Sequence, residues 1–144
     1  MDSDFEFDMT LDDNGVLIFR LSGVFDVDKW ADQHRAAVAR LFPDGFDPTR
    51  PAVTDLRRFR PPQSDWNQIT KRVFSRMDEL GASRRRSALI TGGNPGVEIS
   101  CRFFIVMRNS LFRRDGDIRV FRHFDDGYAW AAEALDDHVP SPIH

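Results

Sequence analysis

Hydrophobic and polar residues alternate at the start of the chain with the period of a β-strand. Residues 5–11 alternate apolar with polar side chains, and residues 16–21 form a second, largely apolar segment. Between them lies Asp12-Asp13-Asn14-Gly15, and an Asn-Gly pair readily adopts the positive φ angles of a tight hairpin turn. The pattern predicts an antiparallel hairpin whose second strand ends at Ser22-Gly23.

After the hairpin, segments with the apolar period of a helix alternate with segments that have the pattern of a strand. Apolar residues spaced three and four apart predict four helices, which begin near Asp26 or Asp28, Ser64, Asn94 and Asp125. The first three of these positions carry good N-cap side chains, and Gly81 is placed as a C-cap of the second helix. Strand patterns separate the helices at 51–56, 87–91 and 117–121.

The predicted order is therefore β-β-α-β-α-β-α-β-α. Because helix and strand alternate after the hairpin, right-handed crossovers and a mainly parallel sheet are expected. We predict an α/β fold with a five-stranded mixed sheet, an antiparallel N-terminal hairpin and four helices. Residues 1–138 are predicted to form a single domain, and residues 139–144, which include two prolines, a flexible C-terminal tail.

Some aromatic residues do not fit the predicted core. Phe19, Phe74, Phe104, Phe112 and Phe121 follow the helix and strand periods, but a second group does not: Phe25, Phe42, Phe46, Phe59 and Phe103. Aromatic side chains outside the core period, with arginines beside them, are typical of a contact patch or a lipid-accepting groove. Single apolar residues on a surface are also ordinary, so both interpretations stay open.

Composition narrows the class of protein. The chain has 144 residues, of which 41% are hydrophobic and 30% charged, a balance that fits neither a disordered nor a membrane protein. One cysteine, Cys101, excludes an internal disulfide framework and a cysteine-based zinc site. No apolar run is long enough to cross a bilayer, and the acidic N-terminus lacks the layout of a signal peptide. We expect a soluble, cytoplasmic protein without membrane insertion.

Charge is distributed unevenly along the chain. Residues 1–50 carry a net charge of −6, residues 51–114 a net charge of +8, and residues 115–144 a net charge of −5. Arginine supplies 18 of the 20 basic residues, and the guanidinium group suits carboxylate or phosphate ligands. The favoured interpretation pairs these arginines with the acidic ends of the chain. Since the pI is about 5.8, nucleic acid is an unlikely partner.

The segment Gly92-Gly93-Asn94-Pro95-Gly96 is the best candidate for an anion-binding loop. A glycine-rich turn that leads into a helix presents backbone N–H groups to an anion. The segment lacks the lysine and hydroxyl pair of a P-loop, so a tight turn capped by Asn94 is the favoured interpretation.

The sequence shows no set of catalytic or metal-binding residues. The histidines, His34, His123, His138 and His144, have no metal-ligand spacing. Cys101 lies on an apolar helix face, as a buried thiol does. No nucleophile, base and orienting group can be assigned together, so we expect neither an enzyme nor a cofactor. A hydrolase that uses Asp55 is the weakest alternative.

Several short motifs, taken in order, resemble one family. A strand ends at Gly23 with Asp26 heading a helix, and a later strand ends Val53-Thr54-Asp55-Leu56-Arg57 with Phe59 after it. The closing elements are the strand 86–90, the strand 118–121 and the helix start Asp125-Asp126-Gly127-Tyr128-Ala129-Trp130. Together they resemble the STAS-like, SpoIIAA-like proteins, whose fold is shared in outline by anti-sigma-factor antagonists and sulfate-transporter tails, and the chain resembles a bacterial member of this family.

The resemblance implies a non-enzymatic regulatory or protein-interaction module. Anti-sigma-factor antagonists carry a phosphorylatable serine in an Asp-Ser-Ser-Gly-like motif, but residues 55–59 here contain no hydroxyl group. We therefore expect no serine phospho-switch. The expected partner is another protein or a second copy of the chain. The alternative is a domain that binds a small ligand such as an anion, a nucleotide or an acyl chain.

The loops after the parallel strands are the expected contact surface, because open α/β sheets bind their ligands at the carboxyl ends of the strands. The candidate contact residues are Asp26, Asp55, Arg57, Arg58, Phe59, Gly93, Asn94 and Gly96.

Overall fold

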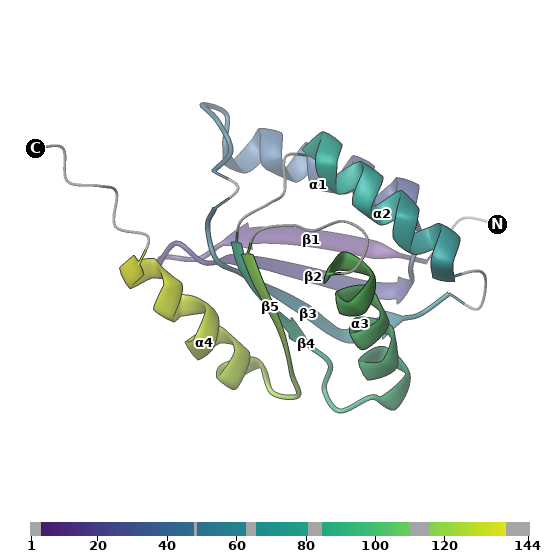
Figure 1. Ribbon diagram of the computed structural model, residues 1–144. Helices are drawn as coiled ribbons and strands as arrows, with labels where there is room; N and C mark the ends of the chain where they lie inside the picture. Colours follow the sequence, from purple (N-terminus) through teal and green to yellow (C-terminus); the bar gives the residue numbers. More distant parts are fainter. Residues whose placement is uncertain (1–3, 48, 63–65, 81–84, 110–115, 138–144) are drawn as a thin grey trace, which may run out of the picture.

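The computed structural model describes residues 4–47, 49–62, 66–80, 85–109 and 116–137 (Figure 1). The strands are β1 (Glu6–Leu11), β2 (Leu17–Val24), β3 (Ala52–Arg60), β4 (Arg85–Ile90) and β5 (Gly116–Phe121). The helices are α1 (Val27–Leu41), α2 (Trp66–Leu80), α3 (Pro95–Met107) and α4 (Phe124–Asp137). This order confirms the sequence prediction.

The five strands form one sheet in the order β1-β2-β3-β4-β5. β1 pairs with β2 in the antiparallel direction, and every later pair is parallel. The mixed sheet with an antiparallel hairpin is thus confirmed. Since strands that are consecutive in sequence are also neighbours in the sheet, each parallel pair is joined by one helical crossover.

The helices cover the two faces of the sheet unequally (Figure 1). α1, α2 and α3 share one face, where the rings of Phe74 and Phe104 stack with their centroids 4.9 Å apart. α4 lies on the other face, over a smaller core that includes Val53, Ile90 and Trp130. α4 contacts β3, β4 and β5. The outward positions of the hairpin strands β1 and β2 include the polar residues Glu6, Asp8, Thr10, Arg20 and Ser22, together with Ile18 and Val24.

Two of the predicted caps are present in the structure. The side chain of Asp26 accepts a hydrogen bond from the Lys29 amide (3.1 Å), and that of Asn94 accepts one from the Val97 amide (3.2 Å). Pro95 occupies the first turn of α3. The predicted caps Ser64 and Gly81, the core residue Phe112 and the tail 139–144 lie outside the described residues.

The prediction that β2 ends at Ser22-Gly23 is wrong. β2 continues to Val24, and β3 extends to Arg60 instead of ending near Leu56. The register of the pair shifts between its ends, because Arg20 lies opposite Asp55 while Ser22 lies opposite Arg58. β3 therefore contains one residue more than β2 over this stretch, which is a β-bulge. The sequence pattern predicted strand ends here, but the two strands stay paired beyond the bulge as far as Val24 and Arg60.

Gly23 allows the extended part of β2 to form. Its φ is +84°, and a Cβ atom on this residue would lie 2.6 Å from the carbonyl oxygen of Asp4. Gly93 has a similar φ of +81° but has no atom within 4 Å of the same position. The two glycines thus share one backbone conformation and differ in the space around it.

We expect Gly23→Ala to lower the free energy of unfolding by more than about 2 kcal/mol, because it adds a backbone clash to the strain of a positive φ. Gly93→Ala is the matched control and should cost only about 1 kcal/mol, the strain alone. Urea denaturation followed by circular dichroism measures both. Equal losses for the two variants would contradict the close approach of Asp4 to Gly23.

Candidate functional site

A cavity of about 190 Å³ lies between the sheet and the layer formed by α1, α2 and α3. Its walls are mainly aromatic and aliphatic, and the aromatic members are Phe7, Phe19, Phe25, Trp30, Phe59 and Phe104. Ile69, Val73 and Met77 contribute the wall formed by α2. Every one of the three helices on this face therefore lines the same cavity.

The alternation of the strands places these side chains. Phe7, Phe19 and Leu56 occupy inward positions on three neighbouring strands, as the period of two predicts. Phe25 and Phe59 did not fit the core pattern in the sequence, yet both line the cavity, and their ring centroids lie 5.6 Å apart. Phe59 reaches it because the bulge in β3 restores the inward orientation three residues after Leu56.

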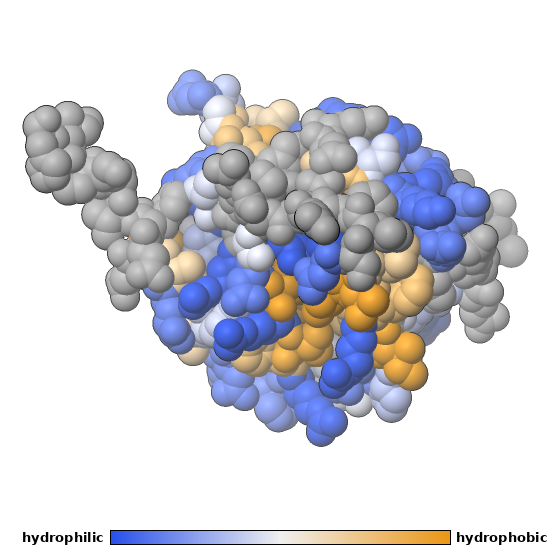
Figure 2. Space-filling model, viewed as in Figure 1, coloured by the Kyte–Doolittle hydropathy of each residue, from blue (hydrophilic) through white to orange (hydrophobic). Residues whose placement is uncertain are grey.

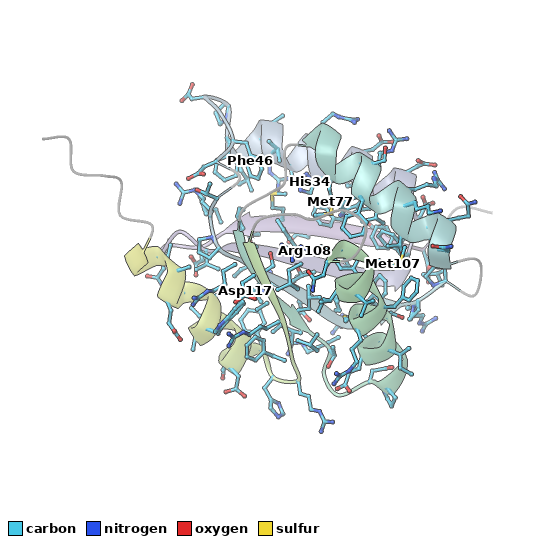
Figure 3. The ribbon with its side chains drawn as sticks, viewed as in Figure 1. His34, Phe46, Met77, Met107, Arg108 and Asp117 are labelled. Carbon is cyan, nitrogen blue, oxygen red and sulfur yellow. The ribbon has the colours of Figure 1, made fainter. Side chains whose placement is uncertain are left out.

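His34 of α1 is a buried polar residue in the wall of the cavity. Its side chain is 3% exposed, and its ring centroid lies 5.6 Å from that of Phe7 and 5.9 Å from that of Trp30. Figure 3 shows His34 near Met77 on the side of the sheet that α1 and α2 cover. The imidazole thus belongs to an aromatic cluster and not to a group of metal ligands.

Four hydroxyl-bearing residues interrupt the apolar wall, of which Thr70 and Ser100 lie on helices and Thr54 and Ser87 on strands. Thr54 of β3 and Ser87 of β4 occupy inward positions, where the same strands otherwise carry Ala52, Leu56 and Leu89. Within the described part of the chain, neither hydroxyl has a hydrogen-bond partner in the protein. Sequence reasoning missed both residues. The available signal was a polar residue at an inward strand position, which a packed core does not need.

A second hollow lies on the opposite face of the sheet, beside the bulge. It is an open groove of about 610 Å³, lined by Arg20, Leu21, Ser22, Asp55, Arg57 and Arg58. We call these residues the arginine groove. Three predicted contact residues, Asp55, Arg57 and Arg58, meet there, whereas the fourth residue of that segment, Phe59, lies in the cavity on the other face.

Asp55 and Arg57 form a tight pair within the groove. The Asp55 carboxylate accepts hydrogen bonds from Arg57 Nε (2.9 Å), Nη2 (2.8 Å) and the Arg57 backbone amide (3.1 Å). Burial raises the pKa of Asp55, but these hydrogen bonds and the charges of Arg57 and Arg20 outweigh it, so the pKa lies below its ordinary value of 3.8. Asp55 therefore stays ionised at neutral pH and orients Arg57.

The backbone amides of the glycine-rich turn before α3 donate hydrogen bonds to acceptors within the protein. The Gly92 amide donates to the Arg122 carbonyl (3.1 Å), and the Gly93 amide donates to Thr91 Oγ1 (3.1 Å). The Asn94 amide donates to the Thr91 carbonyl (3.4 Å). These bonds support the interpretation of a capped turn over that of an anion-binding loop. The remaining predicted contact residues, Asp26 and Gly96, lie at the starts of α1 and α3.

Two other candidate residues from the sequence, Cys101 and Arg86, are packed within the fold. Cys101 is buried beside the cavity, and burial raises its pKa to about 12, so the thiolate of a nucleophile does not form at neutral pH. Arg86 stacks on Trp130 and donates to the Trp130 carbonyl (3.0 Å), which fixes α4 to the sheet.

Across the described residues, no group of histidine, cysteine and carboxylate side chains is arranged to hold a metal ion. No described helix has the length and apolar character needed to cross a membrane.

One solved structure shares this architecture over most of both chains. It is the crystal structure of an uncharacterized protein from the DUF3478 family with a SpoIIAA-like fold, from Shewanella loihica PV-4. The match covers 91% of this chain and 98% of that chain, with a TM-score of 0.60 and 15% sequence identity. The chain has a SpoIIAA-like fold. No protein-family model and no curated protein sequence gives a significant match.

The likeness confirms the fold that the sequence motifs suggested, and at 15% identity it shows the fold alone. The cavity and the arginine groove of this SpoIIAA-like domain are therefore argued from their own geometry.

We expect Asp55→Asn to lower the free energy of unfolding by about 1 to 2 kcal/mol at pH 7, because it weakens charge-assisted hydrogen bonds to Arg57. The folded-state pKa of Asp55 is depressed, so its stabilisation is present above about pH 4 and is lost as the pH falls through the folded value. The difference between wild type and variant should therefore shrink from pH 7 to about pH 3.

Urea denaturation at several pH values measures this difference. Asp28→Asn is the matched control, because Asp28 also pairs with arginines (Arg72 at 2.8 Å) but its side chain is 59% exposed. It should cost less than about 0.5 kcal/mol. A loss for Asp55→Asn that does not vary with pH would contradict the assigned ionisation.

Proposed function

We propose that this SpoIIAA-like domain is a non-enzymatic binding module, and that its cavity holds an apolar chain with one polar group, such as an acyl chain. The observation that carries the proposal is the aromatic cavity of about 190 Å³ between the sheet and three helices. The chemistry around it supports binding and not catalysis, since Cys101, the nucleophilic side chain of the wall, is a protonated thiol.

The energetics of packing support an occupant. Protein interiors are close-packed, and an unfilled space destabilises a fold by roughly 24 cal/mol per Å³. The space of about 190 Å³ between the sheet and the helices leaves such packing contacts of its apolar walls unmade. A bound apolar ligand would supply those contacts.

The size and lining of the cavity describe the ligand. An engineered apolar cavity of about 150 Å³ is known to bind benzene, so this cavity suits an aromatic ring or a short to medium alkyl chain. The hydroxyl groups of Thr54 and Ser87 offer both a donor and an acceptor. They favour a ligand that carries a hydroxyl, carbonyl or carboxyl group over a pure hydrocarbon.

We expect the wild-type domain to bind n-octanol, with a gain in thermal stability that grows with ligand concentration, because the ligand binds only the folded state. Ser87→Leu fills the cavity from the sheet and should weaken octanol binding at least about tenfold, which is a loss of about 1.4 kcal/mol. Isothermal titration calorimetry measures the affinity, and urea denaturation verifies that the variant is folded.

Two variants control this experiment. Thr10→Leu adds the same side chain at an exposed position of β1 and should bind octanol as the wild type does. Thr54→Val keeps the shape of the wall but removes one of its hydroxyl groups, so it should reduce the preference for octanol over n-octane. A wild-type domain that binds neither compound would refute the proposed function.

The protein-interaction module expected from the sequence remains a second candidate, and α3 carries the observation that favours it. The outer side of α3 presents Ile99, which is 69% exposed, and Val106, which is 60% exposed. Phe103 and Arg102 lie at the intervening helical positions. Figure 2 shows apolar residues gathered over α3 and toward β5. A second copy of the chain would cover such a surface in a symmetric dimer.

Native mass spectrometry tests the second candidate. A dimer is expected for the wild type, and the double variant Ile99→Glu, Val106→Glu should shift the population to monomer by at least about tenfold in the dissociation constant. Arg35→Glu, on the exposed side of α1, is the control and should leave the dimer unchanged. A wild type that stays monomeric at high concentration would exclude self-association.

A further inference from the structure

We propose that the arginine groove is a binding site for the dianion of a phosphate monoester. The groove lies on the face of the sheet opposite the cavity, and Arg20, Ser22, Arg57 and Arg58 supply its donors. It is therefore independent of the ligand proposed for the cavity.

The bulge in β3 concentrates the positive charge. In a regular strand, Arg57 and Arg58 would point to opposite faces of the sheet. The extra residue between Asp55 and Arg58 turns both side chains into the groove, where Arg20 and Ser22 of β2 face them. Three guanidinium groups thus come from only two neighbouring strands.

Arg57 is held in place before any ligand binds. Asp55 fixes its guanidinium by two hydrogen bonds, and the ring of Phe124 lies 5.5 Å from Arg57 Cζ. Despite these contacts the Arg57 side chain is 49% exposed, so part of its donor edge still faces the groove. An oriented arginine loses little side-chain entropy when it binds an anion, which favours affinity.

Arg20 and Arg58 complete the site. Both are exposed, and neither has an ion pair or hydrogen bond with a side chain among the described residues. Asp8 lies opposite Arg20 in the sheet register but makes no ion pair within 4.0 Å of it, and the charge of Asp125 acts on Arg57 from α4. The residues that line the groove carry three positive charges and one negative charge, a net charge of +2.

This charge and geometry match a phosphate monoester. Such a group carries a charge of about −1.5 to −2 at pH 7 and three acceptor oxygens directed to different sides. Its oxygens can engage several guanidinium forks at once, whereas one arginine already satisfies a carboxylate monoanion. The groove volume of about 610 Å³ also leaves room for the organic part of the ester.

Nuclear magnetic resonance titrations with glycerol 3-phosphate test the site, with sodium acetate as the monoanion control. Saturable shifts are expected for the backbone amides of Ser22 and Arg58, and acetate should bind at least about tenfold more weakly. Arg20→Gln and Arg58→Gln should each weaken glycerol 3-phosphate binding at least about tenfold. Both side chains are exposed, and Arg20 also acts on Asp55 through its charge. Arg58→Gln should therefore keep the wild-type unfolding midpoint, and Arg20→Gln should lower it only slightly.

Arg102→Gln removes an exposed arginine from α3 and is the matched control, with binding expected to be unchanged. Sedimentation with vesicles that contain phosphatidic acid forms a second arm. Binding to glycerol 3-phosphate identifies a soluble ester as sufficient, and binding to the vesicles alone identifies a lipid headgroup as the source of the same phosphate chemistry. Arg58→Gln binding as tightly as the wild type, acetate binding as tightly as the ester, or no binding in either arm would overturn the proposal.

Discussion

The pairing between β2 and β3 is the interaction on which both candidate sites depend. β3 lies in the centre of the sheet, and one extra residue between Asp55 and Arg58 changes which side chains face which side. Before the bulge, Thr54 and Leu56 point toward the helices, and after it Phe59 does the same. Arg57 and Arg58 lie between these positions and both face the opposite side. A single backbone irregularity thus places an aromatic ring in the cavity and two arginines in the groove.

The unequal covering of the sheet gives its two faces different chemistry. Three helices enclose one face, so its strand positions are apolar except for Thr54 and Ser87. On the other face, α4 packs on β3, β4 and β5 through Trp130 and its neighbours. On the hairpin half of that face, Arg20 and Ser22 lie beside the apolar residues Ile18 and Val24. The two proposed binding sites therefore lie on opposite sides of one strand.

The order of the elements and the antiparallel hairpin followed from sequence patterns because they depend on local chemistry. Alternation in residues 5–11, the Asn14-Gly15 turn and the caps Asp26 and Asn94 each act over a few residues. The extension of β2 and β3 was missed for the opposite reason. The bulge shows its effect only when β2 and β3 are paired, and these strands lie about 35 residues apart in the sequence. Gly23 shows its effect only against Asp4, which lies before β1. Local propensity carries no information about that pairing.

The sequence by itself determined the fold class, the set of helices and strands, and the concentration of arginine in the middle of the chain. Only the tertiary structure decided where those side chains lie. Phe59 lines the cavity with Phe25, whereas Arg57 and Arg58 lie on the opposite face of the sheet. The tertiary structure also placed Arg86 against Trp130 of α4. The physical reason is that a period of two or 3.6 assigns a side chain to a face only while the backbone is regular, whereas the pairing of β2 with β3 interrupts that regularity at the bulge.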